Sequence, residues 1–232
     1  MTTEDSLRHR WLAMSFAVCG TATATMLVSH PSGAAGSFAD TLRAEASHQL
    51  ADALVHGGFI ITLCALMVCF TIWSRMLGSQ RVAVVVGMVS FCVGCGTLIA
   101  SMILDGFVSP ALAARFVGTG SAEGLAMARP LLILCGTLIR FLMPWGLALQ
   151  SVAMFSWSLV LLRMGGIARA AGVFGVVSAV TVLTVFLAFA NLSGHVLLGV
   201  IVVHVIWYAG LAVSLAHTGR AFSRRVQGGV VS

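Results

Sequence analysis

The sequence contains very little charge and no lysine. Only 9% of its 232 residues are charged, whereas a soluble domain usually carries about 25% charged residues. Hydrophobic residues make up 59% of the chain, and its mean hydropathy is +1.03. This composition excludes an ordinary soluble domain and predicts a polytopic protein surrounded by membrane lipids.

Without lysine, arginine is the only basic residue in the chain. The formal net charge is +6, but the arginines are scattered along the loops rather than gathered on one face. This distribution does not indicate nucleic acid as a partner. It is better interpreted as the signal that sets the orientation of a membrane protein.

Motifs that would attach a cofactor or form a disulfide framework are also lacking. All six cysteines lie within apolar stretches, which predicts buried, inert thiols. Cys92 and Cys95 form a Cys-x-x-Cys pair in the middle of an apolar run, where a thiol is unreactive, so redox or metal use is not favoured. Because there is no Cys-x-x-Cys-His motif, any haem would be bound non-covalently.

What the chain does contain is a series of apolar runs, each about long enough to cross a bilayer. The first follows a charged start but has no clean cleavage site after Val28, so we interpret it as a retained span. We predict an all-α integral membrane six-helix bundle, formed as a single domain over residues 1–232. The expected spans are approximately 11–29, 50–73, 82–104, 141–162, 170–190 and 195–216.

Two connections are longer than simple turns. Residues 30–46 are expected to form a loop, and residues 105–130 to hold a short amphipathic helix at 110–117 and a glycine-rich turn. The apolar region 131–162 is too long for one ordinary span and is interrupted by Arg140 and Pro144. A kinked or tilted helix, or a short interfacial piece before the span, would explain it.

The arginines predict that both termini are cytoplasmic, because cytoplasmic loops carry an excess of basic residues. With this orientation, nine arginines lie inside, namely Arg8, Arg10, Arg75, Arg81, Arg163, Arg169, Arg220, Arg224 and Arg225. Four lie outside, namely Arg43, Arg115, Arg129 and Arg140.

A polar ladder marks the start of the second span. His48, Asp52 and His56 recur at every fourth residue, so they share one face of a helix. Ionisable groups that enter a membrane are costly, which makes a functional role more probable than for the same residues in water.

The predicted topology brings other polar residues to the depth of this ladder. Helix rise places His30, His56, Asp105 and His195 all roughly 25–35 Å from the cytoplasmic ends of their spans. Asn191 lies at the same outer turn as His195, and Arg140 lies near the outer end of the fourth span. The alternative is a purely structural role, in which these residues contact lipid headgroups or cap helices.

A metal site is the leading interpretation of this outer group. Imidazole and carboxylate ligands suit copper, iron or zinc. The candidate ligands are His56, Asp52, His195, His48, His30 and Asn191. Haem b held between His56 and His195 is a variant of the same hypothesis. Asp105 is a candidate metal ligand, a candidate hydrogen-bond partner of a ligand, or a catalytic base. Arg140 is a candidate contact for an anionic group.

Several functions use such a site. We expect an oxidoreductase that acts on a lipophilic substrate, with metal-assisted hydrolysis as the rival reaction. A small transporter with Arg140 and His204 in its pathway, acting as a homo-oligomer, is an alternative from another class. A non-catalytic membrane assembly subunit is a third.

Two stretches resemble small polytopic membrane proteins of bacteria. They are Ser29-His30-Pro31-Ser32-Gly33 and Asp105-Gly106-Phe107-Val108-Ser109-Pro110-Ala111-Leu112-Ala113. The resemblance covers most of the chain and implies a multi-pass protein of the bacterial inner membrane, but it implies no activity.

A second resemblance is local. The spacings Asp52-x-x-x-His56 and Asn191-x-x-x-His195 are similar to ligand spacings in the membrane copper subunit of the particulate methane and ammonia monooxygenases. The further histidine lies at a different spacing here, and the arrangement of spans differs. The likeness therefore implies copper as a metal and not membership of that family.

Overall fold

The computed structural model describes residues 3–29, 37–118, 121–188 and 193–228, and in these every regular element is a helix. In chain order they are α1 Thr3–Val28, α2 Phe38–Leu77, α3 Val82–Ile103, the short π-helix η1 Leu104–Val108, α4 Ser109–Val117, α5 Ala122–Leu161, α6 Gly166–Ala188 and α7 Gly194–Gly228. Six helical segments are long and apolar enough to cross a membrane, with α3, η1 and α4 together forming one of them. The predicted all-α six-helix membrane bundle is confirmed.

Two helices are longer than the sequence predicts. The segment expected to be a loop before residue 47 is helical from Phe38, because Ser37 and Asp40 form a reciprocal capping box. The region around Arg140 and Pro144 is one unbroken helix, α5, whose start is capped by the Ser121 hydroxyl accepting from the Gly124 amide at 3.0 Å. Hydropathy misses both starts because polar caps and small residues carry no apolar signal.

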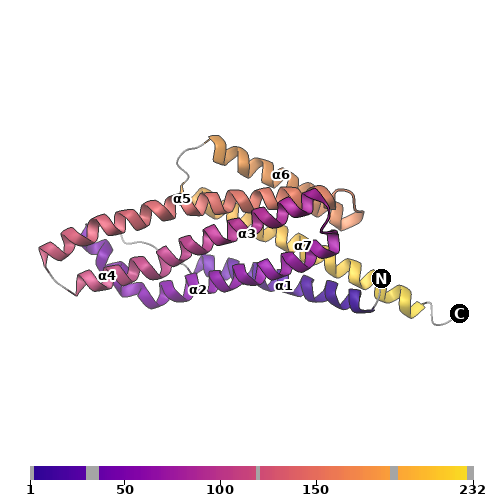
Figure 1. Cartoon of the computed structure of the whole chain (residues 1–232). Helices are drawn as coiled ribbons and strands as arrows, with labels where there is room; N and C mark the ends of the chain where they lie inside the picture. The colour runs from indigo at the N-terminus through magenta and orange to yellow at the C-terminus, as the bar shows by residue number, and fades with distance from the viewer. Residues whose placement is uncertain (1–2, 30–36, 119–120, 189–192, 229–232) are drawn as a thin grey trace.

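Five helices surround the centre of the bundle. Each of the pairs α1 with α2, α2 with α3, α3 with α5, α5 with α7 and α7 with α1 is in contact, so the five close a ring. The sixth, α6, packs on the outside against α5 and α7 (Figure 1). The first residues of α1 and the last of α7 lie at one end of the elongated molecule, and α4 lies at the other (Figure 1).

The end that holds α4 extends beyond the length of a membrane span. Helices α2 and α5 have 40 residues each, or about 60 Å, whereas a hydrocarbon core is about 30 Å thick. Their N-terminal halves join α4 around a separate small core of Leu42, Ala113 and Ala128. We call this part, formed by α4 and the N-terminal halves of α2 and α5, the α4 lobe.

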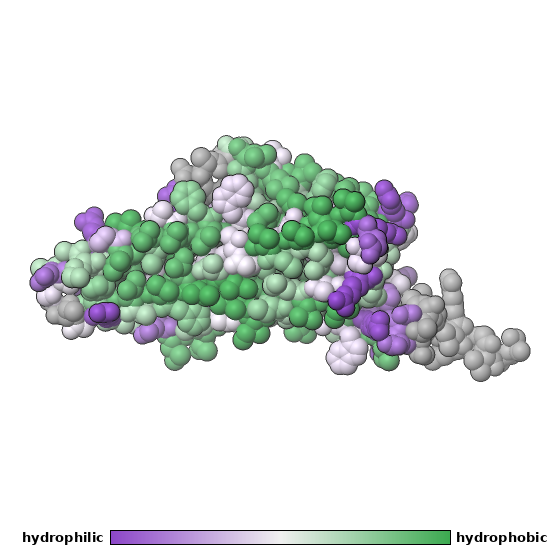
Figure 2. All heavy atoms as spheres, in the orientation of Figure 1, coloured by the Kyte–Doolittle hydropathy of each residue, from purple (hydrophilic) through white to green (hydrophobic). Residues whose placement is uncertain are grey.

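Hydrophobic side chains cover most of the visible flank between the two ends, and hydrophilic residues gather toward the ends (Figure 2). Among the exposed residues at the end near the termini are Arg75, Arg81, Arg163 and Arg169. This distribution is the one expected of a bundle whose flank contacts lipid.

The half of the bundle nearer the termini is filled by stacked aromatic rings. Phe70 lies parallel to Trp157 with ring centroids 4.4 Å apart. Trp207 also stacks on Phe70, with ring centroids 5.8 Å apart. The Trp157 indole nitrogen donates to the Ser74 hydroxyl at 3.1 Å. This aromatic cluster, completed by Phe16, Trp73, Phe91 and Tyr208, is the main core of the protein.

Candidate functional site

A buried histidine and a carboxylate meet where the α4 lobe joins the bundle. His56, near the middle of α2, is 2% exposed, and its Nε2 lies 3.2 Å from Oδ2 of Asp105 in η1. The other ring nitrogen, Nδ1, lies 2.9 Å from the backbone carbonyl of Asp52. A carbonyl can only accept, so Nδ1 carries a proton. Any hydrogen bond between Nε2 and the carboxyl group therefore requires one further proton, which the pair shares.

The local shape of η1 makes this approach feasible. Gly106 packs directly against the side chain of His56, where a Cβ atom would collide with the Cβ and the ring. The π-helix places one wide turn at this position, a distortion that is frequent at functional sites. Asp105 thus forms the polar contact with His56, and Gly106, which has no side chain, leaves room for the imidazole ring.

Asp52 lies one helical turn before His56 and is also buried, at 7% exposure. Its backbone carbonyl fixes the orientation of the His56 ring. Asp105 is different, because its side chain is 35% exposed. The pair therefore joins a shielded imidazole to a carboxylate that reaches the surface.

Below this pair the five-helix ring encloses a cavity of about 110 Å³. Its wall is mostly apolar and contains Leu27, Phe59, Leu63, Leu66, Leu98, Met102, Met143, Leu147, Ile201 and Val205. His56 contributes to the wall from α2, and Gln150, His204 and Tyr208 contribute from α5 and α7. The cavity is thus mainly apolar, with a few polar side chains in its wall.

His204 is the second buried histidine of the cavity, with 3% exposure. Its Nδ1 lies 2.8 Å from the Val200 carbonyl, and its Nε2 lies 3.4 Å from the Ser151 hydroxyl. Beside it, the Gln150 amide donates to the Cys95 thiol at 3.4 Å. These side chains form a polar cluster that lies deeper in the bundle than His56.

The two histidines lie at different levels. Along α1, Met26 lies beside Gly58 of α2 and Gly20 lies beside Val205 of α7. Six residues separate Gly20 from Met26, which corresponds to about 9 Å of helix. Both histidines line the cavity, His56 from α2 and His204 from α7, and within the described residues these two helices are not in close backbone contact.

The structure brings together only part of the predicted metal set. His56 and Asp105 are paired and Asp52 is adjacent, but His48 is exposed on the α4 lobe and His195 is exposed at the start of α7. His30 and Asn191 lie outside the described residues. Among the residues that the structure describes, no three His, Cys, Asp or Glu side chains are grouped as metal ligands.

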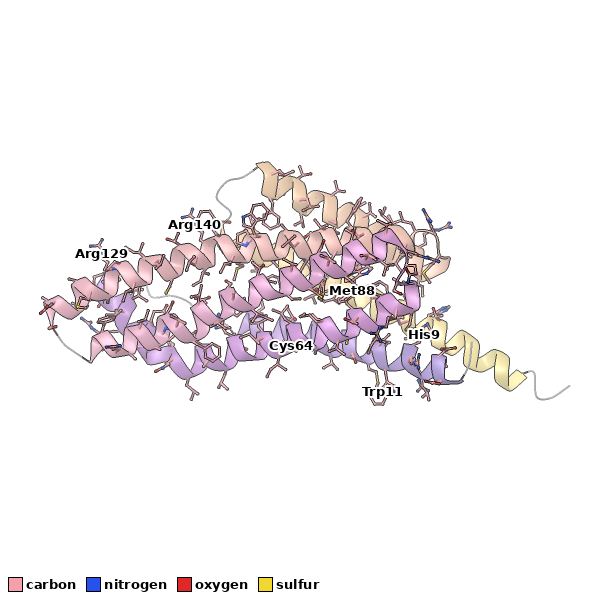
Figure 3. The ribbon with its side chains drawn as sticks, viewed as in Figure 1. His9, Trp11, Cys64, Met88, Arg129 and Arg140 are labelled. Atoms are coloured by element: carbon pink, nitrogen blue, oxygen red, sulfur yellow. The ribbon has the colours of Figure 1, made fainter. Side chains whose placement is uncertain are left out.

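Arg140 does not face the cavity. It projects from the outer side of α5, as does Arg129 (Figure 3). Cys64 is exposed on α2, so the expectation that all cysteines are buried is wrong at this position. Cys95 is buried, Cys92 is half-buried, and both are free thiols.

Sequence reasoning missed Gln150 and Ser151 and gave His204 no connection to His56. The available signal was the pair of adjacent polar residues in an apolar span, since a buried polar group in a membrane needs a partner. Which span would supply that partner depends on the order of helices around the ring.

Comparison of the chain with protein-family models, with curated proteins and with solved structures found no match. The chemistry of the site must therefore be inferred from its own geometry. A shared proton at the margin of an apolar cavity can serve as a general acid or base toward a bound molecule.

Proposed function

We propose that this membrane protein binds a small lipophilic molecule inside its helix bundle and exchanges a proton with it through His56 and Asp105. The observation that carries the proposal is that His56 belongs both to the proton-sharing pair and to the wall of the apolar cavity. An apolar protein cavity of about 150 Å³ accepts one benzene molecule. The cavity of about 110 Å³ is somewhat smaller, so it suits a ligand, or the head of a longer ligand, no larger than about one ring.

The pair has the features that proton exchange requires. Nδ1 is held by the Asp52 carbonyl, so only Nε2 changes its protonation. The buried imidazole is the group that meets the ligand. The Asp105 carboxylate is 35% exposed and would connect the pair to the surface of the bundle. Oxidation or reduction of a lipophilic substrate, the reaction class favoured by the sequence, uses such a pair as proton acceptor or donor.

A metal ion at His56 is the second candidate. The bond from Nδ1 to a backbone carbonyl is the usual outer contact of a histidine that binds copper, iron or zinc through Nε2. A metal site needs more protein ligands than the two that His56 and Asp105 supply. Proton exchange needs only these two groups, so the first candidate is better supported. The apolar wall also suits a lipophile better than the path of a transported ion.

The arginine distribution supports an orientation in which the termini face the cytoplasm. In a bacterial inner membrane the His56–Asp105 pair would then lie toward the outer side. A ligand that partitions into lipid could enter from the bilayer, and its proton could reach the outer aqueous phase through Asp105.

The test uses phenol as a ring-sized probe, with equilibrium dialysis of the protein in lipid nanodiscs against empty nanodiscs. Leu63→Trp fills the cavity and should lower phenol affinity at least about tenfold, since the ring loses its site. Ile61→Trp adds the same side chain two residues earlier, where Ile61 is 72% exposed, and should leave affinity unchanged. Phenol binding that is equal in the two variants would refute the cavity as the site.

Proton exchange is checked in the same assay. Affinity in the unsubstituted protein should depend on pH between about pH 5 and 8, where histidine titrates, and His56→Leu should remove this dependence. Elemental analysis of the same preparations tests the second candidate. Stoichiometric copper, iron or zinc that His56→Leu abolishes would favour the metal over proton exchange.

A further inference from the structure

The outward face of α5 carries an apolar stripe that extends into the α4 lobe. Six side chains recur there at alternating spacings of four and three residues, and each is between 41% and 66% exposed. They are Met127, Leu131, Leu134, Leu138, Phe141 and Trp145. An average spacing of 3.5 residues keeps them on one face of the helix over about five turns, or about 27 Å. We call these six side chains the α5 stripe.

Lipid tails can cover only part of the α5 stripe. Depth along the helix is measured from Leu161, the last residue of α5, which lies just before the exposed Arg163. Phe141 is about 30 Å from that point, at the far boundary of a hydrocarbon core of the same thickness. Leu134 is about 40 Å away and Met127 about 51 Å, and an ordinary tilt of about 20° shortens these depths by less than a tenth. The upper part of the stripe therefore lies beyond the lipid tails.

The other long helix of the α4 lobe has a different surface. On α2 the exposed apolar residues Leu50 and Leu54 are preceded by Arg43, Ser47 and His48, which are polar and also exposed. The apolar surface of α2 thus ends where the lobe begins, whereas that of α5 continues. A contiguous apolar surface that lipid does not cover marks a site of interaction with another protein.

We propose that the α5 stripe packs against the same stripe of a second copy of this chain. Apolar residues with a period of 3.5 are the pattern of helices that pair as a coiled coil. Two copies in one membrane have the same orientation, so a twofold axis along the membrane normal places their α5 helices parallel. Each residue of the stripe then meets its own counterpart, and both stripes are covered at once over their full length.

The charges on α5 permit this pairing. The α5 stripe itself contains no charged residue. Arg129 and Arg140 follow Met127 and Leu138 by two residues, which turns them by about 200° around the helix. Both arginines project away from the bundle (Figure 3). The like charges of two copies therefore do not meet across the twofold axis, where they would oppose association.

The size of the α5 stripe also suits a dimer. The exposed parts of its six side chains amount to on the order of 600 Å² per copy, or about 1,200 Å² for two copies, which reaches the lower limit of a specific interface. A second copy supplies a matching apolar stripe of equal length and spacing by symmetry. A different protein would need a complementary surface of its own.

The first experiment detects the contact in native membranes. Cys64, an exposed cysteine, is replaced by serine, and a cysteine is then introduced by Leu134→Cys or by Ile133→Cys. Ile133 is the matched control, because it is apolar and 58% exposed, close to the 55% of Leu134, but is turned by about 100° from it. A short bismaleimide should link Leu134→Cys into a species of twice the chain mass. The Ile133→Cys variant and the Cys64→Ser chain without an added cysteine should stay at the mass of one chain.

Three outcomes of this experiment would overturn the proposal. The first is no linked species from Leu134→Cys. The second is equal linking from Leu134→Cys and Ile133→Cys, which would indicate random collision in the membrane. The third is linking of Leu134→Cys to a protein of another mass, which would make the stripe the site of a different partner.

The second experiment measures the strength of the contact by sedimentation equilibrium of the whole chain in detergent. Leu134→Arg places two like charges opposite each other at the axis and should raise the dissociation constant of the dimer at least about tenfold. Ile133→Arg adds the same charge outside the stripe and should leave it unchanged. The near-ultraviolet signal of the aromatic cluster shows that each variant is folded. Equal dissociation constants for the two folded variants would overturn the proposal.

Discussion

The two halves of the bundle are filled in opposite ways. Toward the termini, Phe70, Trp157 and Trp207 stack nearly in parallel within the main buried core. Toward the α4 lobe, the same five helices enclose a cavity with a histidine at each of two levels. Tyr208 belongs to both halves, because it lines the cavity and also packs on Phe16 of the aromatic cluster. The aromatic cluster is therefore the floor of the cavity.

This difference indicates that one half of the bundle provides stability and the other half holds the candidate site. Lipid tails are as apolar as leucine, so a membrane bundle is stabilised mainly by close packing between helices. The stacked half supplies that packing. The other half can then tolerate a cavity, a π-helix and buried ionisable groups, each of which lowers stability locally. Substitutions in the two halves should consequently affect different properties.

The largest expected effect is a loss of stability from the stacked half. Trp157→Ala removes a fully buried ring that contacts Phe70 and donates to Ser74. Truncations of this kind cost about 3–5 kcal/mol, which thermal unfolding followed by circular dichroism would show. Trp145→Ala on the same helix changes a side chain that is 66% exposed and should stay within about 0.5 kcal/mol. Similar losses in the two variants would contradict the assignment of stability to this half.

An intermediate effect is expected from Gly106→Ala, which addresses the other half. The added methyl group would collide with His56, and overpacking of this kind costs about 1–3 kcal/mol. Phenol binding should be lost while the near-ultraviolet signal of the aromatic cluster remains. Gly96→Ala on α3 is the matched control, because its Cβ meets nothing within 4 Å, and it should be neutral or stabilising by up to about 1 kcal/mol. If Gly106→Ala binds phenol normally, the close approach of η1 to His56 is not needed for the site.

The sequence was most informative where a signal accumulates over many residues. Six long apolar runs predicted six spans, and the depth of each run brought His56 and Asp105 to a similar level, where the structure pairs them. It was least informative at helix starts. The capping box of Ser37 and Asp40 extends α2 into a stretch that hydropathy assigns to a loop.

The partner across the cavity could not be predicted from depth alone. His195 shares the expected level of His56, but it is exposed, and His204, nine residues further along α7, lines the cavity instead. Nine residues turn a helix by about half a revolution, so only one of the two can face inward. Which one does so depends on how α7 packs against α1, and no pattern within α7 itself contains that information.

The smallest effect on stability, and the sharpest on function, is expected from Asp105→Asn. The amide keeps the shape of the carboxyl group and can still form a hydrogen bond with His56, but it cannot share an ionisable proton. Because the Asp105 side chain is 35% exposed, the loss of the ion pair should cost about 1 kcal/mol or less. The protein should therefore fold and bind phenol, while the pH dependence of its affinity disappears as in His56→Leu. Dialysis at about pH 5 and 8 measures this. Full retention of the pH dependence in Asp105→Asn would show that His56 exchanges its proton without the carboxylate, and the pair would then be a structural contact between α2 and η1.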